Sequence, residues 1–474
     1  MRTALRSTGG SLAAAGGGAL LLSLLFALLS LLAATRDPGP ARERLRASLE
    51  AGSFSASLGT FSLPLGSREV PAWDSNDCLI FMMLVLPRQD LARDAFSPRI
   101  PTRLEPEPAG DPVQARCERL GELLTTDPDP PAHRYDRYLH GQRVLATLLL
   151  PLTGPEGLRR LVTTAVALAL AGLALLAGWR GRQRQGTPEA LRDAAFAGYA
   201  LCLLAFHALP MFGRYWSHAL SDLPVVVLLW ALYLAPPAPA ARGLLLGLLG
   251  AAVSMLEFLT GQWPLAVALI LLAAAAQPSP PGWRAVARDL AGFGLGVVLP
   301  LAAKLALGAL LFADVAPAAE GSGLLHRIYG PVVPEMSPRE AARLAALGFD
   351  VTRLDTEPWW RLPYVAARLA YFAFVPGAGA WRLGLGGTAA WVFGLALLAG
   401  SVGVLAWRFG AGLPRRGGVS PHLWWALAAC GAMLGWYVLF LNHTLLHTAW
   451  MARTLVVFPM AAWVAWLARP AARA

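Results

Sequence analysis

The chain has 474 residues, 56% of them hydrophobic, and a formal net charge of +11 at pH 7. Its mean hydropathy of +0.50 is higher than an ordinary soluble domain needs, so the composition excludes a water-soluble fold of the usual kind. The basic charge does not indicate nucleic-acid binding, because membrane topology accounts for all of it.

Stretches of about twenty apolar residues, each long enough to cross the ~30 Å hydrocarbon core of a bilayer, recur along the chain. They predict an all-α fold, a polytopic membrane helix bundle of about ten spans. The first stretch follows the basic start MRTALR and is longer than the core of a usual signal peptide, so we expect a retained anchor. The stretches lie near residues 11–34, 158–179, 194–211, 219–235, 243–259, 263–277, 290–313, 388–407, 422–441 and 454–468.

The distribution of charge predicts the orientation. With the N-terminus inside, the short cytoplasmic pieces hold fourteen arginines against three acids, which accounts for the whole net charge of +11. The positive-inside rule therefore places both termini in the cytoplasm and two long segments outside. The predicted parts are the N-terminus with its anchor (1–34), a first outer loop (35–157), a transmembrane bundle (158–313), a second outer segment (314–387) and the C-terminal spans (388–474).

Within the outer segments, apolar runs too short to span the membrane predict interfacial helices at the outer leaflet. They are LIFMMLVLP (79–87), RVLATLLLPL (143–152) and the aromatic stretch at 358–374. Cys78 and Cys117 share the outer compartment, where a disulfide can form. The sequence leaves open whether these two cysteines are bridged.

Short polar strings collect where predicted spans meet the outer side. Seven of the eight histidines lie outside or near the outer ends of spans, whereas the cytoplasmic loops carry no comparable cluster. A reaction or recognition site is therefore expected to face the outside. The strings are WDSNDC (73–78), HRYDRYLHGQR (133–143), FGRYWSHALSD (212–222), LEFLTGQW (256–263) and NHTLLHTAWMAR (442–453).

Lys304, the only lysine of the chain, lies within the apolar stretch 290–312. An ammonium in hydrocarbon costs a few kcal/mol, so such a residue normally faces a protein or water-filled cavity and meets an anion. Pro300, one turn earlier, is expected to bend the helix. The alternative is that Lys304 reaches the outer headgroups. We favour an interior anion site.

Several other cations suit a phosphate by their charge and donor geometry. Arg137, His140, Arg143 and Arg214 form a cationic set near the outer leaflet. Arg453 runs against the positive-inside bias, which favours a function over an interfacial anchor.

His443 and His447 are spaced i,i+4, so a helix turns both the same way. That spacing also suits a metal pair, but a third ligand is not evident, so we expect a pocket wall and no metal. No cofactor is expected, although a divalent cation remains open.

Three acids near the outer boundary are candidates for chemistry. Asp74 and Asp77 precede an apolar helix, where an acid serves equally as a general base or as a helix cap. Glu257 lies at the outer end of its predicted span and either caps the next turn or functions at membrane depth.

The architecture resembles the GT-C superfamily of membrane glycosyltransferases, with an inside N-terminus, one anchor and a long outer loop carrying an early acid. The strings YDRYLHG, EFLTGQWPLAVAL and NHTLLHTAWMAR are similar to a bacterial GT-C-like membrane family whose stretches read approximately RYWHGY, FDFLTYP and NHSxxHxWFTYR. This chain has Leu139 where that family usually has Trp, and Glu257 where it has Asp. The residues that the resemblance singles out are Asp77, Arg137, His140, Glu257, Lys304, His443, His447 and Arg453.

The resemblance implies an enzyme of the bacterial inner membrane that transfers a sugar from a polyprenyl-phosphate carrier to a glycan or lipid acceptor at the extracytoplasmic face. Asp77 would accept the proton of the attacking hydroxyl, and Arg137, His140, Lys304 and Arg453 would hold the leaving phosphate. One alternative is an O-antigen polymerase or ligase acting on polyprenyl-pyrophosphate glycans, which would not depend on Asp77. The other is a lipid-carrier transporter, which would need polar residues at both membrane faces.

Overall fold

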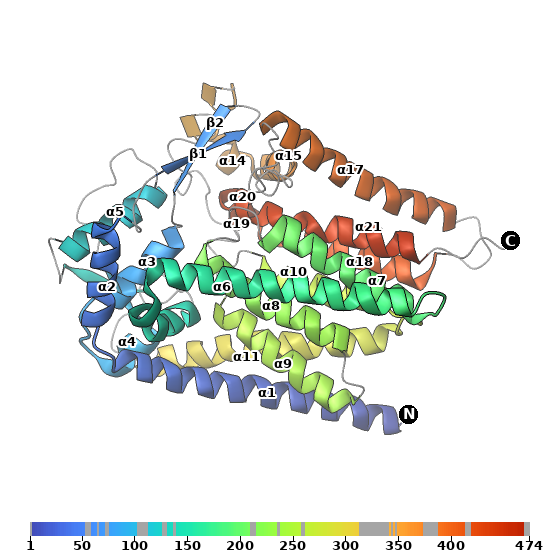
Figure 1. Cartoon of the computed structure of the whole chain (residues 1–474), viewed down its shortest axis with the longest axis horizontal. Coiled ribbons are helices and arrows are strands. Elements are labelled where there is room, and N and C mark those ends of the chain that lie inside the picture. Colours follow the sequence, from blue (N-terminus) through green and yellow to red (C-terminus); the bar gives the residue numbers. More distant parts are fainter. Residues whose placement is uncertain are drawn as a thin grey trace.

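Long helices lie side by side along one axis of the molecule, and a smaller helical part sits at one end (Figure 1). The structure is a computed structural model. It describes residues 2–52, 58–63, 66–71, 75–101, 112–125, 130–135, 139–208, 215–234, 238–256, 261–311, 341–342, 345–346, 348–372, 387–412 and 419–468.

Each predicted span coincides with a helix of the bundle. Seven described helices are long and apolar enough to cross a membrane, namely α1, α6, α8, α9, α11, α17 and α18. The polytopic helical architecture is thereby confirmed, whereas α7, α10 and α21 are shorter and the count of ten spans stays a prediction. The helices are α1 (Arg2–Ala34), α6 (Gly141–Gln183), α7 (Glu189–Leu203), α8 (Trp216–Leu234), α9 (Pro239–Leu256), α10 (Gln262–Ala275), α11 (Trp283–Leu311), α17 (Gly387–Gly412), α18 (Pro421–Leu439) and α21 (Val457–Leu467).

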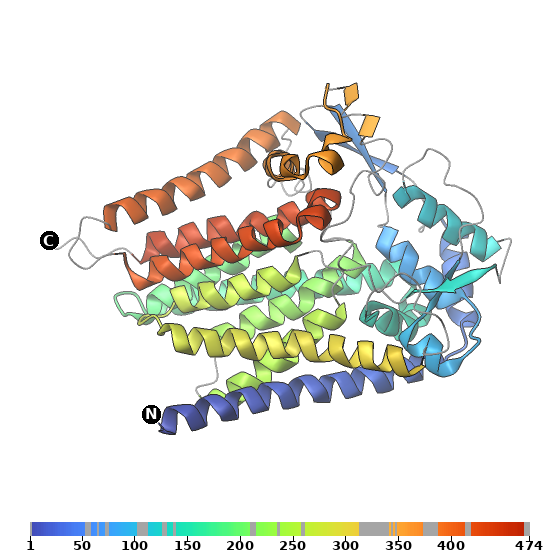
Figure 2. The same cartoon turned by 180° about the vertical axis from the view of Figure 1, so that it is seen from behind.

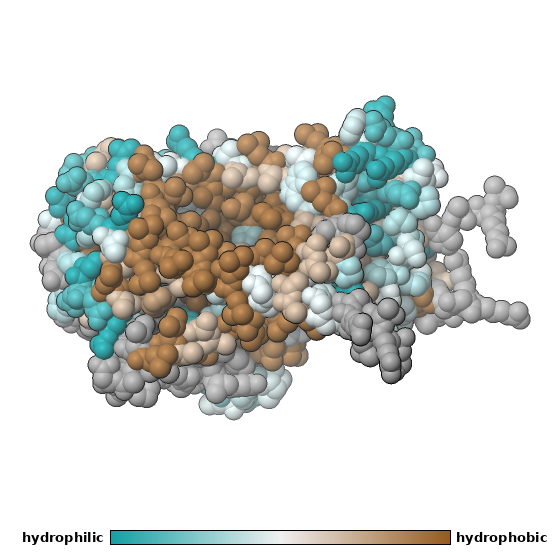
Figure 3. Space-filling view, turned by 90° about the horizontal axis from the view of Figure 1, so that it is seen from below, coloured by the Kyte–Doolittle hydropathy of each residue, from teal (hydrophilic) through white to brown (hydrophobic). Residues whose placement is uncertain are grey.

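The side of the bundle is apolar. Large hydrophobic side chains point outward, including Leu24 at 60%, Leu168 at 67% and Leu175 at 75% exposure. Figure 3 shows a broad hydrophobic band on one face, with hydrophilic surface at both ends. A band of this kind is stable only when lipid covers it, because exposed apolar patches on soluble monomers are much smaller.

The helix α1 begins and α21 ends at the same end of the bundle (Figures 1 and 2). The opposite end carries the small helical part, which we call the outer domain after its predicted side of the membrane. It consists of α2 (Gly39–Glu50), α3 (Ser75–Val85), α4 (Leu91–Phe96), β3 (Arg99–Pro101), α5 (Pro112–Thr125) and β4 (Ala132–Arg134). The hairpin of β1 (Leu58–Leu63) and β2 (Gly66–Pro71) contacts α17 instead. Two antiparallel strand pairs, β1–β2 and β3–β4, add a little strand to an otherwise helical chain.

The prediction of an interfacial helix at 79–87 is wrong for the part that the structure describes as α3. Every side chain from Asp77 to Leu86 is buried, and α3 forms the core of the outer domain together with residues of α2 and α5. A short helix that is apolar on all sides has no polar face for the headgroups, so it is stable in a protein core instead.

The interfacial position of residues 143–152 stays a prediction. These residues belong to α6, which is divided by non-helical backbone angles at Gly154 (φ 69°, ψ 171°) just before Pro155. Ala146 and Leu150, in the arm before this break, pack into the same core as α3. The arm therefore attaches the outer domain to the bundle.

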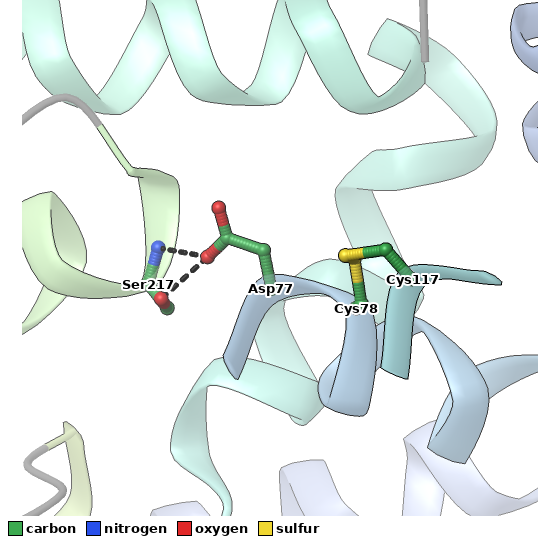
Figure 4. Close-up of a disulfide and its surroundings, with 4 residues drawn as sticks. All are labelled: Asp77, Cys78, Cys117 and Ser217. Carbon is green, nitrogen blue, oxygen red and sulfur yellow. Dashed lines mark hydrogen bonds between the residues drawn. A yellow bond between two sulfur atoms is a disulfide. The ribbon is translucent and has the colours of Figure 1, made fainter. Parts of the chain in front are cut away.

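Cys78 on α3 and Cys117 on α5 form a disulfide (Figure 4). A disulfide fits the predicted outer placement of this domain, because such bonds persist in oxidising compartments. Cys202 and Cys430, which lie within bundle helices, are free thiols.

Candidate functional site

Asp77 lies in the first turn of α3 and is fully buried. Its side chain turns toward the start of α8, while the neighbouring Cys78 turns toward Cys117 (Figure 4). One carboxylate oxygen, Oδ1, accepts the backbone N–H of Ser217 at 3.1 Å and its hydroxyl at 2.5 Å. Asp77 thus caps the N-terminus of another helix, where a negative charge is stabilised by the helix dipole.

The start of α8 is also joined to the N-terminal arm of α6. Ser221, one turn after Ser217, donates its hydroxyl to the Ser217 carbonyl at 2.9 Å. The Gln142 amide donates to the Ser221 hydroxyl at 3.3 Å, and both side chains donate to the Leu256 carbonyl at the end of α9. Asp77 and the beginning of α6 therefore contact adjacent turns of α8.

His140 immediately precedes α6 and has left-handed backbone angles (φ 59°, ψ 32°), which are rare outside glycine and asparagine. Its ring is buried, and Nε2–H donates to the Tyr135 carbonyl at 2.8 Å. Burial lowers the pKa of His140 well below its usual value, and the charges of Lys304 and Arg143 lower the pKa further. The ring is therefore neutral at pH 7, so it orients its surroundings and adds no positive charge.

Lys304 lies on α11, and its charge acts on the His140 ring. The Lys304 side chain is half-buried, whereas Leu305, the next residue, is 75% exposed on the lipid-facing side. Lys304 is therefore turned toward the protein, near the start of α6. The structure thus brings together two of the residues predicted to hold a phosphate.

Arg453 is placed differently from the prediction. Its guanidinium forms two hydrogen bonds with Asp222 on α8, at 3.0 and 3.1 Å, and both side chains are buried. The same carboxylate accepts His207 Nε2–H and the Gln262 amide, each at 2.9 Å. Two donors of Arg453 are committed to Asp222, so we no longer assign Arg453 to the phosphate.

His443 and His447 lie next to each other, with ring centroids 4.5 Å apart, as their spacing predicts. His443 is on α19 (Leu441–Leu446) and is buried. The preceding Asn442 accepts a hydrogen bond from Arg361 at 2.7 Å, which attaches α15 (Arg361–Phe372) to this segment. Among the described residues, no group of three potential ligands is placed to hold a metal ion.

The first two turns of α8, residues 216–222, are where these contacts meet. Ser217 holds Asp77, Ser221 meets Gln142, and Asp222 holds Arg453. His218, between them, packs its ring against Trp450 with centroids 4.2 Å apart. We call this group the polar junction: Asp77, Gln142, His207, Ser217, His218, Ser221, Asp222, Gln262, Trp450 and Arg453.

Four predicted site residues lie outside the part of the chain that the structure describes, namely Asp74, Arg137, Arg214 and Glu257. Sequence reasoning missed Asp222, whose signal was a carboxylate within an apolar helix. It also missed Ser217, Gln142 and Arg361, because a single serine, glutamine or arginine at a membrane boundary carries no specific signal.

Comparison of the chain with protein-family models, with characterised proteins and with solved structures yields no match. The chain is a multi-pass helical membrane protein in which a disulfide-linked domain meets the helix bundle at a buried polar junction.

Proposed function

We propose that this protein is a membrane glycosyltransferase of the GT-C kind, which transfers a sugar from a polyprenyl-phosphate carrier to an acceptor hydroxyl at the extracytoplasmic face. The observation that supports it most is the position of Asp77 and Lys304 relative to α6. Asp77 is held by Ser217, one turn before the α8 residue that meets Gln142 of α6, and the charge of Lys304 acts on His140, which directly precedes α6. A carboxylate and a cation at one end of the bundle are the minimum that this reaction needs.

In the proposed reaction, the acceptor oxygen attacks the anomeric carbon and its proton passes to Asp77. The bond between the anomeric carbon and the phosphate oxygen breaks, and its electron pair leaves with the polyprenyl phosphate. Lys304 stabilises the charge that develops on this phosphate. Ser217 fixes the orientation of the Asp77 carboxylate, and neutral His140 shapes the start of α6.

The test uses the full-length protein in lipid nanodiscs, supplied with a panel of polyprenyl-phosphate hexoses and pentoses and with lipid and glycan extracts as acceptors. Release of polyprenyl phosphate is followed by mass spectrometry. Asp77→Asn is expected to lower the rate by about 10²–10⁴-fold with little change in carrier binding. Lys304→Met is expected to weaken binding of the carrier. Arg182→Gln, which removes one positive charge at the opposite end of α6, is the matched control.

Unchanged turnover in Asp77→Asn would remove Asp77 from the role of base. Unchanged carrier affinity in Lys304→Met would return Lys304 to the headgroup-anchor interpretation. Release of polyprenyl diphosphate from glycan-loaded carriers, independent of Asp77, would assign the chain to the polymerase or ligase alternative.

A further inference from the structure

Four arginines gather where the outer domain meets the membrane-spanning helices. Arg88 follows α3, Arg99 is on β3, Arg134 is on β4 and Arg143 is in the first turn of α6. Asp94, on α4, is the carboxylate within reach that is buried with them. It pairs with Arg134 at 3.0 Å and accepts the backbone N–H groups of residues 89 and 90. Asp94 is thus paired with Arg134, and its single negative charge also acts on Arg88 and Arg143.

Arg143 is the most unusual member, because its side chain has no exposure at all. One guanidinium nitrogen, Nη2, donates to the Ala95 carbonyl at 2.7 Å. Within the described part of the chain, its Nε and Nη1 meet no hydrogen-bond acceptor, and Arg143 forms no ion pair. Burying a charged guanidinium with unsatisfied N–H groups lowers the stability of the fold by several kcal/mol unless an anion compensates the charge.

Arg88 adds a second charge to the same place. It donates through Nη1 to the Met83 carbonyl at 3.1 Å, and its Nε meets no acceptor among the described residues. The positive charges of Arg88 and Arg143 oppose each other. Burial lowers the pKa of Arg88, and Asp94 opposes this effect only in part. Two like charges held together in a protein interior indicate a ligand of opposite charge.

We propose that Arg88 and Arg143 form a binding site for a phosphate group, either free phosphate or the phosphodiester of an anionic phospholipid headgroup. Guanidinium groups match phosphate oxygens with paired, charge-assisted hydrogen bonds. Arg143 is fully buried and Arg88 is half-buried, so Arg143 forms the inner side of the proposed site and Arg88 its rim.

The position of the site suits a headgroup. Helix α4, which carries Asp94 and Ala95, packs against α1 and α11 and lies beside the outer end of α1 (Figures 1 and 2). The apolar helix α1 ends at Ala34, and lipid phosphates follow the end of an apolar span. The proposal concerns Arg88 and Arg143, and it does not depend on Asp77 or on the identity of the donor sugar.

The test measures the thermal unfolding midpoint of delipidated, detergent-solubilised full-length protein by tryptophan fluorescence. One arm adds sodium phosphate against sodium chloride at matched ionic strength, and the other adds phosphatidylglycerol against phosphatidylcholine. A rise of about 2 °C or more at saturation is expected in at least one arm. A rise with phosphate assigns the site to the free anion, and a rise confined to phosphatidylglycerol assigns it to a headgroup.

Arg88→Gln and Arg143→Gln should each remove at least half of this rise. Arg160→Gln, which changes an exposed arginine of α6, and Lys304→Met, which changes the proposed donor site, should both retain it. If Arg143→Gln fails to fold, the result for Arg88→Gln decides the test, because Arg88 is only half-buried at the rim of the site and its substitution disturbs the fold less. The proposal is overturned if neither arm gives a rise, or if the rise persists undiminished in Arg88→Gln.

Discussion

Asp222 and Arg453 form a buried two-point ion pair although 231 residues separate them in the chain. The pair joins α8 to η6 (Ala452–Val456), the short helix that leads into α21. Through His207 and Gln262, the same carboxylate also reaches η1 (Leu204–Ala208) and the start of α10. Among the described residues, the side chains that bind this buried carboxylate are all donors, and they stabilise its charge.

Removing either member of the pair should therefore be costly. Asp222→Asn or Arg453→Gln leaves its partner buried without a matching charge, and we expect a loss of about 3–5 kcal/mol of unfolding free energy. Replacing both with apolar residues, Asp222→Leu with Arg453→Met, should cost clearly less than the sum of the two single variants. Denaturant unfolding of the four proteins measures this double-mutant cycle. Additive losses would show that the two side chains are not coupled.

The spans were predictable because the length of an apolar run and the thickness of the bilayer are local rules. The polar junction was predictable only as a set of strings at the outer boundary. Its pairings could not be read from the sequence, since Asp77 meets a serine 140 residues away. The error at α3 has a physical cause as well. The length of a nine-residue apolar run does not distinguish an interfacial helix from a helix in a protein core. The distinguishing feature of α3 is that it has no polar face, which favours the core.

The helices α1, α9 and α11 approach one another through glycines. A Cβ atom at Gly247 of α9 would lie well inside van der Waals contact with the Ala15 carbonyl of α1. The clashing atoms of Ala15 are backbone atoms, so a side-chain rotation cannot relieve the clash. Gly247→Ala should therefore lower the unfolding free energy by about 1–3 kcal/mol, because the helices must separate. Gly294→Ala on α11 is the matched control, since a Cβ there meets nothing within 4 Å. Equal midpoints for the two variants in thermal unfolding would contradict the close approach.

The disulfide between Cys78 and Cys117 lies directly beside Asp77. Cys117→Ser should lower the unfolding free energy by about 2–4 kcal/mol, because the cross-link restricts the unfolded chain. The wild-type protein should show a similar loss after reduction, whereas Cys117→Ser should not respond to reductant. Thermal unfolding with and without reductant measures both effects. Cys202→Ser, which changes a free thiol of the bundle, should respond to reductant as the wild type does. A reductant-insensitive wild type would mean that the bridge is absent or adds no stability.

His140 should make stability depend on pH. Its pKa in the folded protein lies well below the usual 6.5, chiefly because the ring is buried. Below pH 6.5 the unfolded chain therefore binds a proton that the folded protein does not. The stabilising contribution of neutral His140 is complete above pH 6.5 and is lost as the pH falls, by up to about 1.4 kcal/mol per pH unit.

His140→Asn removes this titration while keeping a side chain that tolerates left-handed backbone angles. The wild type should be the more stable protein at pH 7.5, because its ring fits the site, and its advantage should shrink steadily between pH 6.5 and 5. Denaturant unfolding across this range measures the difference between the two curves. His133→Asn, at an exposed position on β4, controls for the change of side chain. If the unfolding free energies of wild type and His140→Asn change in parallel with pH, the His140 ring takes up a proton in the folded protein as readily as in the unfolded chain. The proposed role of a neutral His140 ring at the start of α6 would then be wrong.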